Sequence, residues 1–194
     1  MANKEYLLSQ IADAGYDVGF GAKKHFATFD IVEKTPGWIG LVSMGVGVFA
    51  LFVDCLATQH ISAVLIVLGI CGLLINSYSE VKQNYEKVGK HLTQLFNELK
   101  ALYFHVKSSG KIDFSEEEEK LSAIKSDFFS SCISKQILFS DWYAHYKFFW
   151  QHQIDWIDEQ KQFSFFRDKV PLSFYGFVFL VIVGLGGCFF YLLF

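Results

Sequence analysis

The chain has 194 residues, of which 52% are hydrophobic, and its mean hydropathy of +0.29 lies above the range usual for soluble domains. The formal net charge is -3 and bases alternate with acids, so we expect no direct nucleic-acid binding. The four cysteines, Cys55, Cys71, Cys132 and Cys188, show no paired spacing, which argues against a disulfide framework and a bound metal.

The N-terminal block, residues 1–36, offers no signal peptide, so the first membrane span must itself direct the chain to the membrane. Gly15, Gly19 and Gly21 precede two lysines and superficially resemble a phosphate loop. That loop requires a glycine followed directly by Lys and then Ser or Thr, after a buried strand, and this segment has neither. We instead predict a helix break at the glycines, before an amphipathic juxtamembrane helix over 22–34.

Three long segments almost without charge are candidate membrane spans. The first, 37–57, has about 21 residues, and the second, 61–77, has about 17, which is close to the lower limit for a hydrocarbon core roughly 30 Å thick. The third, 171–194, has no charge. The sequence therefore predicts an all-α integral membrane protein with a transmembrane hairpin, long cytoplasmic helices and a third, C-terminal transmembrane helix.

The distribution of Lys and Arg predicts the topology. None lies between the first two spans and none follows the third, so all 17 lie on one side of the membrane. By the positive-inside rule that side is the cytoplasm. We expect a bacterial inner-membrane protein with its N-terminus and middle domain, residues 78–170, in the cytoplasm and its C-terminus in the periplasm.

Polar and small residues within the spans are the candidate functional positions. Asp54 lies about 24 Å along a helix from Trp38, near the outer edge of the hydrocarbon. It either reaches the outer interface or lines the mouth of a pore in an oligomer, with Asn76 as its cytoplasmic counterpart. Small residues let helices approach closely in lipid. Those in the spans are Gly40, Ser43, Gly47, Gly69, Gly72, Gly184 and Gly187.

After the second span, apolar residues recur at heptad spacing over nearly four repeats, with charged residues between them. The seam comprises Val81, Tyr85, Val88, Leu92, Leu95, Leu99, Leu102 and Val106. This pattern predicts a helix that packs against another helix, either in the same chain or in a neighbouring subunit. Beyond it, Ser115 followed by four glutamates predicts a capping box between Ser115 and Glu118.

The segment 134–166 is dense in Trp, Tyr and Phe at helical spacing, which predicts a helix between a bundle, the lipid headgroups and another protein. On it, Asp141, His145, His152 and Asp155 can share one face. A single straight helix cannot close around an ion, so we expect no metal. Without a catalytic or nucleotide-binding motif, we also expect no cofactor and no enzymatic activity.

Three segments carry a resemblance to a known family: DVGFGAKKHFATFDIVEKTPGW before the hairpin, KVGKHLTQLFNELKALYF after it, and SKQILFSDWYAHYKFFWQHQIDWIDEQ. Over roughly residues 10–170 the chain resembles the SLATT domains, which associate with SMODS nucleotidyltransferases and SLOG nucleotide sensors. The resemblance supplies no catalytic residues.

The resemblance implies a membrane effector of a bacterial antiphage system that stops the infected cell by abortive infection. Such an effector oligomerises and permeabilises or depolarises the inner membrane when a partner, a nucleotidyltransferase or reverse transcriptase encoded nearby, senses infection. The chain has no recognisable nucleotide-sensor domain, which favours control by a separate protein. The alternative is a non-catalytic membrane anchor that docks a cytoplasmic enzyme.

Overall fold

The computed structural model describes residues 2–152 and 154–193, and the side chains of residues 3–152 and 154–184. Within these ranges the chain is all-helical and has no strand, as predicted. The elements in chain order are α1 (Ala2–Phe49), η1 (Asp54–Leu56), α2 (Gln59–Asn76), α3 (Lys82–Ser108), α4 (Ser115–Ser131), α5 (Ser140–Gln151), α6 (Asp155–Lys161), α7 (Phe165–Asp168) and α8 (Leu172–Leu193).

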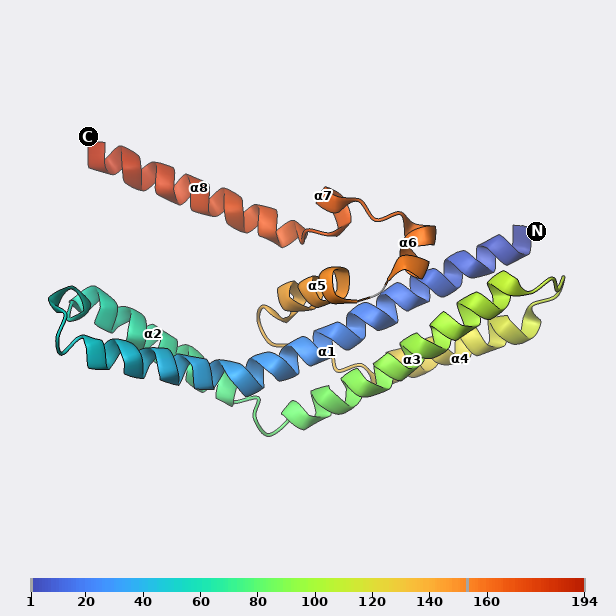
Figure 1. Ribbon diagram of the computed structural model, residues 1–194, viewed down its shortest axis with the longest axis horizontal. Helices are drawn as coiled ribbons and strands as arrows, with labels where there is room; N and C mark the ends of the chain where they lie inside the picture. Colours follow the sequence, from blue (N-terminus) through green and yellow to red (C-terminus); the bar gives the residue numbers. More distant parts are fainter. Residues whose placement is uncertain (1, 153, 194) are drawn as a thin grey trace.

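Helix α1 runs along most of the molecule and belongs to both of its parts (Figure 1). Its N-terminal part is the centre of a bundle and packs against α3, α4, α5 and α6, while its C-terminal part pairs with α2. The apolar face of the bundle part is buried from Leu7 to Val32. With 48 residues, α1 is about 72 Å long, so a single continuous helix connects the bundle to the hairpin.

The predicted helix break at Gly15, Gly19 and Gly21 is wrong, because α1 is continuous through all three. Each glycine lies under an aromatic ring. A Cβ atom at Gly19 would lie 2.8 Å from the ring of Phe96, and one at Gly21 would lie 2.9 Å from that of Phe128. Burial of these rings offsets the cost of glycine in a helix, about 1 kcal/mol for each residue.

The heptad seam of α3 packs inside the chain. Six of its eight residues are buried: Tyr85, Leu92, Leu95, Leu99, Leu102 and Val106. Val88 packs at the edge of the same core, while Val81, just before the helix, is 43% exposed. The core partners of the seam include Leu7, Ile11 and Val18 of α1, so this seam is filled within one subunit.

The aromatic segment does not form one helix, contrary to the prediction. It divides into α5, α6 and α7, with a break near His152. The break lets the segment wrap around α1. Phe148 of α5 packs against Gly19 and Trp156 of α6 packs against Gly15, so both rings reach the same groove in α1.

The predicted capping box at the start of α4 is also wrong. Oδ1 of Asp113 accepts hydrogen bonds from the backbone N–H of Ser115 at 3.1 Å and from its hydroxyl at 2.6 Å. The N–H of Glu118 donates to the carbonyl of Phe114. Asp113 therefore orders the helix start, since an Asp side chain readily bonds the backbone two residues on.

The predicted first span, 37–57, is helical only as far as Phe49, and α2 follows after a turn and η1. After Pro36 the helical part of α1 has 13 residues, about 20 Å, which is short for a hydrocarbon core of about 30 Å. By length and composition, α2 is the one helix in the described part of the chain that can cross a membrane. Helix α8 runs to Leu193, and the part of it with described side chains, Leu172–Gly184, is also apolar.

Candidate membrane-active hairpin

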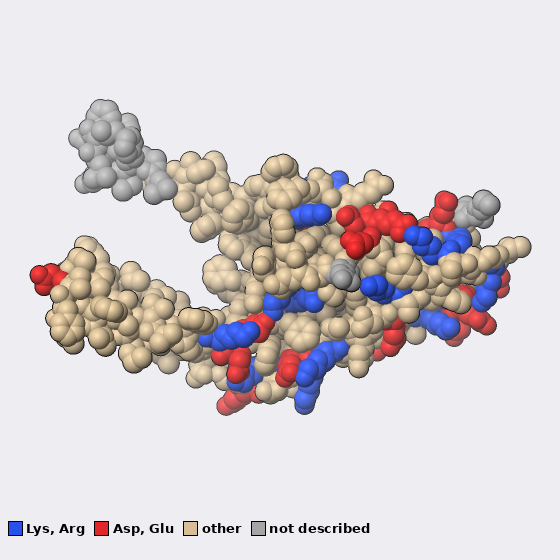
Figure 2. Space-filling model, in the orientation of Figure 1, with Lys and Arg blue, Asp and Glu red and all other residues tan. Residues whose placement is uncertain are grey.

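The hairpin of α2 and the end of α1 leaves apolar side chains open on its outer surface. The half-buried residues of α2 recur every three or four positions and face α1: Ile61, Leu65, Leu68, Gly72 and Ile75. None of α2 is fully buried, so it is not the core helix of a soluble fold. On the face drawn in Figure 2, charged atoms occur on the hairpin only at its tip and where it meets the bundle. Such a surface fits lipid.

The two candidate pore residues lie at opposite ends of α2. Asp54 is exposed in η1, at the turn of the hairpin and outside any α-helix, whereas the sequence predicted it within the first span. Asn76 is the last residue of α2, and its Oδ1 accepts a hydrogen bond from the hydroxyl of Ser79 at 2.7 Å. The 18 residues of α2 separate them by about 27 Å, so one chain does not join them in a single site.

Most of the predicted small-residue faces have no partner among the residues that the structure describes. A Cβ atom at Gly40, Gly47, Gly69 or Gly184 would have no neighbouring atom within 4 Å, so these positions are open. Gly72 faces α1, where its Cβ would lie 3.8 Å from Ile39, and Ser43 is half-buried. The surroundings of Gly187 lie outside the described side chains.

Ion pairs hold α1 to the bundle just before the hairpin begins. Asp30 binds Lys34 at 2.7 Å and also pairs with Lys147 of α5, while Glu33 pairs with Lys82 at the start of α3 at 2.5 Å. Burial alone would raise the pKa of Asp30, but hydrogen bonds from Lys147 and Lys34 hold that pKa below its usual value. Only the Asp30–Lys34 spacing could have been found from sequence.

The segment between α4 and α5 is fixed across α1 and α3 by hydrogen bonds to a buried histidine. His25 accepts the backbone N–H of Ile133 at Nε2 (3.0 Å) and donates from Nδ1 to the carbonyl of Gly21 (2.8 Å). This pattern assigns the neutral ring, because Nε2 must be unprotonated to accept. Burial lowers the pKa of His25 as well. Tyr85 donates to the carbonyl of Lys135 at 2.5 Å, which fixes the same segment to α3.

Helix α8 contacts the bundle through its first turns. The indole N–H of Trp142 donates to the hydroxyl of Ser173 at 2.7 Å, and its ring lies 5.9 Å from that of Phe174 and 5.7 Å from that of Phe177. Beyond this contact α8 extends on the same side of the bundle as the hairpin and stands apart from it (Figure 1).

The structure separates the four residues considered as a metal site. Asp141 pairs with Lys24, and the ring of His145 lies against Phe149, 4.7 Å away. His152 lies on Phe96, also within a hydrophobic setting. In the described part of the chain, no three His, Cys, Asp or Glu residues form a group that could hold a metal ion.

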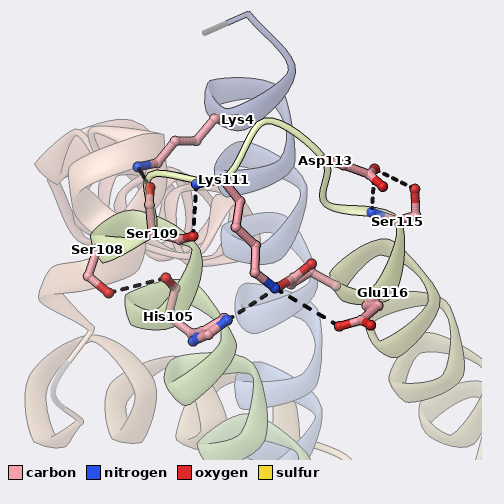
Figure 3. A network of polar contacts seen from close by, with 9 residues as sticks. Lys4, His105, Ser108, Ser109, Lys111, Asp113, Ser115 and Glu116 are labelled. Atoms are coloured by element: carbon pink, nitrogen blue, oxygen red, sulfur yellow. Dashed lines mark hydrogen bonds and ion pairs between the residues drawn. The ribbon is translucent and has the colours of Figure 1, made fainter.

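A polar network closes the end of the bundle far from the hairpin (Figure 3). Glu117, one of the four glutamates that follow Ser115, is buried and binds Lys111 at 3.1 Å and His105 at 3.2 Å. The ammonium of Lys4 donates to the carbonyls of Lys107 and Ser109, at the C-terminal end of α3. The network joins α1, α3 and α4, so it supports the bundle.

An apolar helical hairpin joined to a helical bundle by one shared helix defines a class of helical membrane protein. The family model described as SMODS and SLOG-associating 2TM effector domain 6, a SLATT family, matches residues 2–178, and the chain belongs to that family. Comparison with curated proteins and with solved structures gave no match. Membership makes the protein a membrane effector of conflict systems, in a family not known for catalysis. Most of α8 lies beyond the matched residues.

Proposed function

We propose that this protein oligomerises and permeabilises or depolarises the bacterial inner membrane when a partner sensor acts on its cytoplasmic bundle. The observation that carries the proposal is the continuity of α1, whose N-terminal part is the centre of the bundle and whose C-terminal part forms the hairpin. A partner that shifts the bundle helices around α1 would therefore act on the hairpin, because both parts belong to one continuous helix.

Pro36 supplies a joint between the two parts. It lies inside α1, after the last buried bundle residue, Val32, and before the exposed apolar residue Trp38. Proline lacks the N–H that would bond the carbonyl of Val32, so the helix is most easily bent there. The ion pairs of Asp30 and Glu33 fix the bundle side of this joint.

An oligomer is needed because a single hairpin has no polar lining. Several copies could approach closely at Gly40, Gly47 and Gly69, which are open in one chain. Asp54 would then form a ring at the outer end of the assembly and Asn76 a ring at the cytoplasmic end, as expected for the two mouths of a path.

The second candidate function is a passive anchor that docks a cytoplasmic enzyme. The observation favouring it is the hairpin's composition, since between Lys34 and Glu80 the sole Asp, Glu, Lys or Arg is Asp54. In this case the exposed aromatic residues of the bundle, such as Tyr146 and Trp150, would receive the partner.

Inducible expression in a bacterium, followed by growth and entry of a membrane-impermeant dye, tests the proposal. We expect dye entry and growth arrest, either from the chain alone or after its operon partners are added and triggered. Sealed cells in both conditions would favour the anchor.

The variants Asp54→Ala and Asn76→Leu test whether these two residues line the path through which the membrane leaks. We expect both to reduce dye entry at equal membrane abundance, whereas Glu80→Ala and Asn84→Leu, matched changes at exposed positions outside the hairpin, should not. If Asp54→Ala and Asn76→Leu both leave the leak unchanged, these residues do not line it.

A further inference from the structure

The corner that leads into α5, residues 137–142, exposes two large apolar side chains side by side. Ile137 is buried in the bundle, but Leu138 is 75% exposed and Phe139 is 59% exposed. Single exposed apolar residues are common on protein surfaces. This pair differs because the backbone itself is arranged to present it.

Phe139 adopts a left-handed backbone conformation, with φ 68° and ψ -2°. Bulky L-residues rarely adopt this conformation, which glycine enters without cost. The ring of Phe139 lies 5.7 Å from that of Trp142, yet most of the side chain remains open. The contacts made within the chain therefore do not account for a phenylalanine at this strained position.

The corner lies between two helices that lead toward the membrane. On one side, the ammonium of Lys135 lies 5.0 Å from the ring centroid of Tyr78, two residues after the end of α2. On the other side, Trp142 is bonded to Ser173 in the first turn of α8. In Figure 1 the linker enters α5 beside the start of α8. Leu138 and Phe139 therefore lie at the level where the chain meets the bilayer.

We propose that Leu138 and Phe139 insert into the cytoplasmic leaflet of the bilayer and anchor the bundle to the lipid surface. The occupant is lipid because the corner continues the contacts of α2 and α8 and because Lys135, exposed beside it, suits anionic headgroups. Hydrogen bonds from the N–H of Ile133 to His25 and from Tyr85 to the carbonyl of Lys135 tie the segment before this corner to α1 and α3, so the anchor also holds α1 relative to the surface.

Spin labelling of the full chain in vesicles of phosphatidylethanolamine and phosphatidylglycerol tests the anchor. With the four cysteines replaced by serine, a nitroxide is placed at Leu138→Cys or, as the matched control, at Ile112→Cys, which is 95% exposed in the loop between α3 and α4. We expect the ratio of collisions with oxygen to collisions with a water-soluble nickel chelate to be several-fold higher at position 138.

An equal ratio at positions 138 and 112 would overturn the proposal. So would spin–spin broadening at position 138 that disappears when labelled protein is diluted with unlabelled protein, since a second copy would then cover the corner. The measurement depends on insertion of the chain in a membrane but not on permeabilisation, so a chain that never leaks still gives the expected ratio.

Phe139→Gly separates anchoring from folding. Glycine accepts the left-handed backbone, so the variant should unfold in detergent at the same temperature as the parent or a higher one. We expect the label at position 138 to lose its several-fold preference for oxygen in this variant. A label that keeps the full preference would show that Phe139 is not part of the anchor.

Discussion

Two histidines of the bundle are neutral because of where their rings lie. His25 accepts a backbone N–H, and His152 lies on the ring of Phe96, 4.6 Å away. Burial, with the nearby charges of Lys23 and Lys100, lowers the pKa of His152 to about 4. In the unfolded chain a histidine titrates near 6.5. Between these two values the unfolded state binds more protons than the folded state.

Acid should therefore destabilise the bundle below neutral pH. Stability from the neutral ring is fully present above about pH 6.5 and is lost as the pH falls toward about 4. Paired carboxylates such as Asp30 add to this loss only at lower pH, because their pKa values are depressed from 3.8. We expect thermal unfolding in detergent to shift to lower temperature from pH 7 to pH 4.5.

His152→Gln should weaken that pH dependence, and His60→Gln, a change at an exposed position in the first turn of α2, should leave it intact. The same slope in all three proteins would assign the acid sensitivity to other groups.

At the residue scale the sequence could identify types of residue but not their long-range partners. It singled out Gly15, Gly19 and Gly21 as unusual and assigned them to a helix break. Glycine lowers the stability of a helix, and the aromatic rings that pack against these three glycines come from distant segments that a local pattern does not show. It missed His25 and Glu117, whose burial depends on segments more than ten residues away. No local pattern in a single sequence reports such pairings.

At the scale of helices, glycine and aromatic positions form one packing unit. Phe96 of α3 and Phe148 of α5 both occupy the space above Gly19 of α1, as ridges of one helix fill a groove of another. This packing, more than intrinsic helix propensity, explains how α1 stays helical through three glycines.

Gly19→Ala should destabilise the protein by about 1–2 kcal/mol. Overpacking against two rings costs about 1–3 kcal/mol, and the better helix propensity of alanine returns up to about 1 kcal/mol. Chemical denaturation in detergent measures the difference. Gly37→Ala, where nothing lies within 4 Å, is the matched control and should be neutral or slightly stabilising. Equal stability of the two variants would contradict the tight contact.

Helix number and position were predictable where apolar periodicity was strong, as in α3. Helix number and position were not predictable in residues 134–166. Aromatic residues there occur on every side, and their spacing fits one helix as well as three. The break between α5 and α6 arises from the need to cover α1, and that need exists only in the assembled bundle.

At the scale of the whole molecule, the arrangement places the hairpin tip and the bundle at opposite ends (Figure 1). The predicted topology puts the tip in the periplasm and the bundle in the cytoplasm, on the basis of the Lys and Arg distribution. Cys55 in η1 is exposed and reports on the tip without any engineered residue.

A membrane-impermeant maleimide should label Cys55 in intact spheroplasts when the other three cysteines are replaced by serine. A cysteine-free chain carrying Ile112→Cys should react only after lysis. This exposed position lies in the loop between α3 and α4, at the end of the bundle, which the predicted topology places in the cytoplasm. The reverse pattern would invert the topology. Labelling of both positions without lysis would indicate a membrane already permeable to the reagent, which a simultaneous dye measurement detects.

Asp54 is the sole formally charged side chain between Thr35 and Ser79, and with the tip in the periplasm it must cross the bilayer. Because an energised bacterial membrane is negative inside, outward transfer of a carboxylate is favoured by about 2.3 kcal/mol per 100 mV. A lysine at this position would be opposed by the same amount. In that orientation the membrane voltage assists insertion of the hairpin. If the assembled protein depolarises the membrane, as proposed, it also weakens the insertion of further copies.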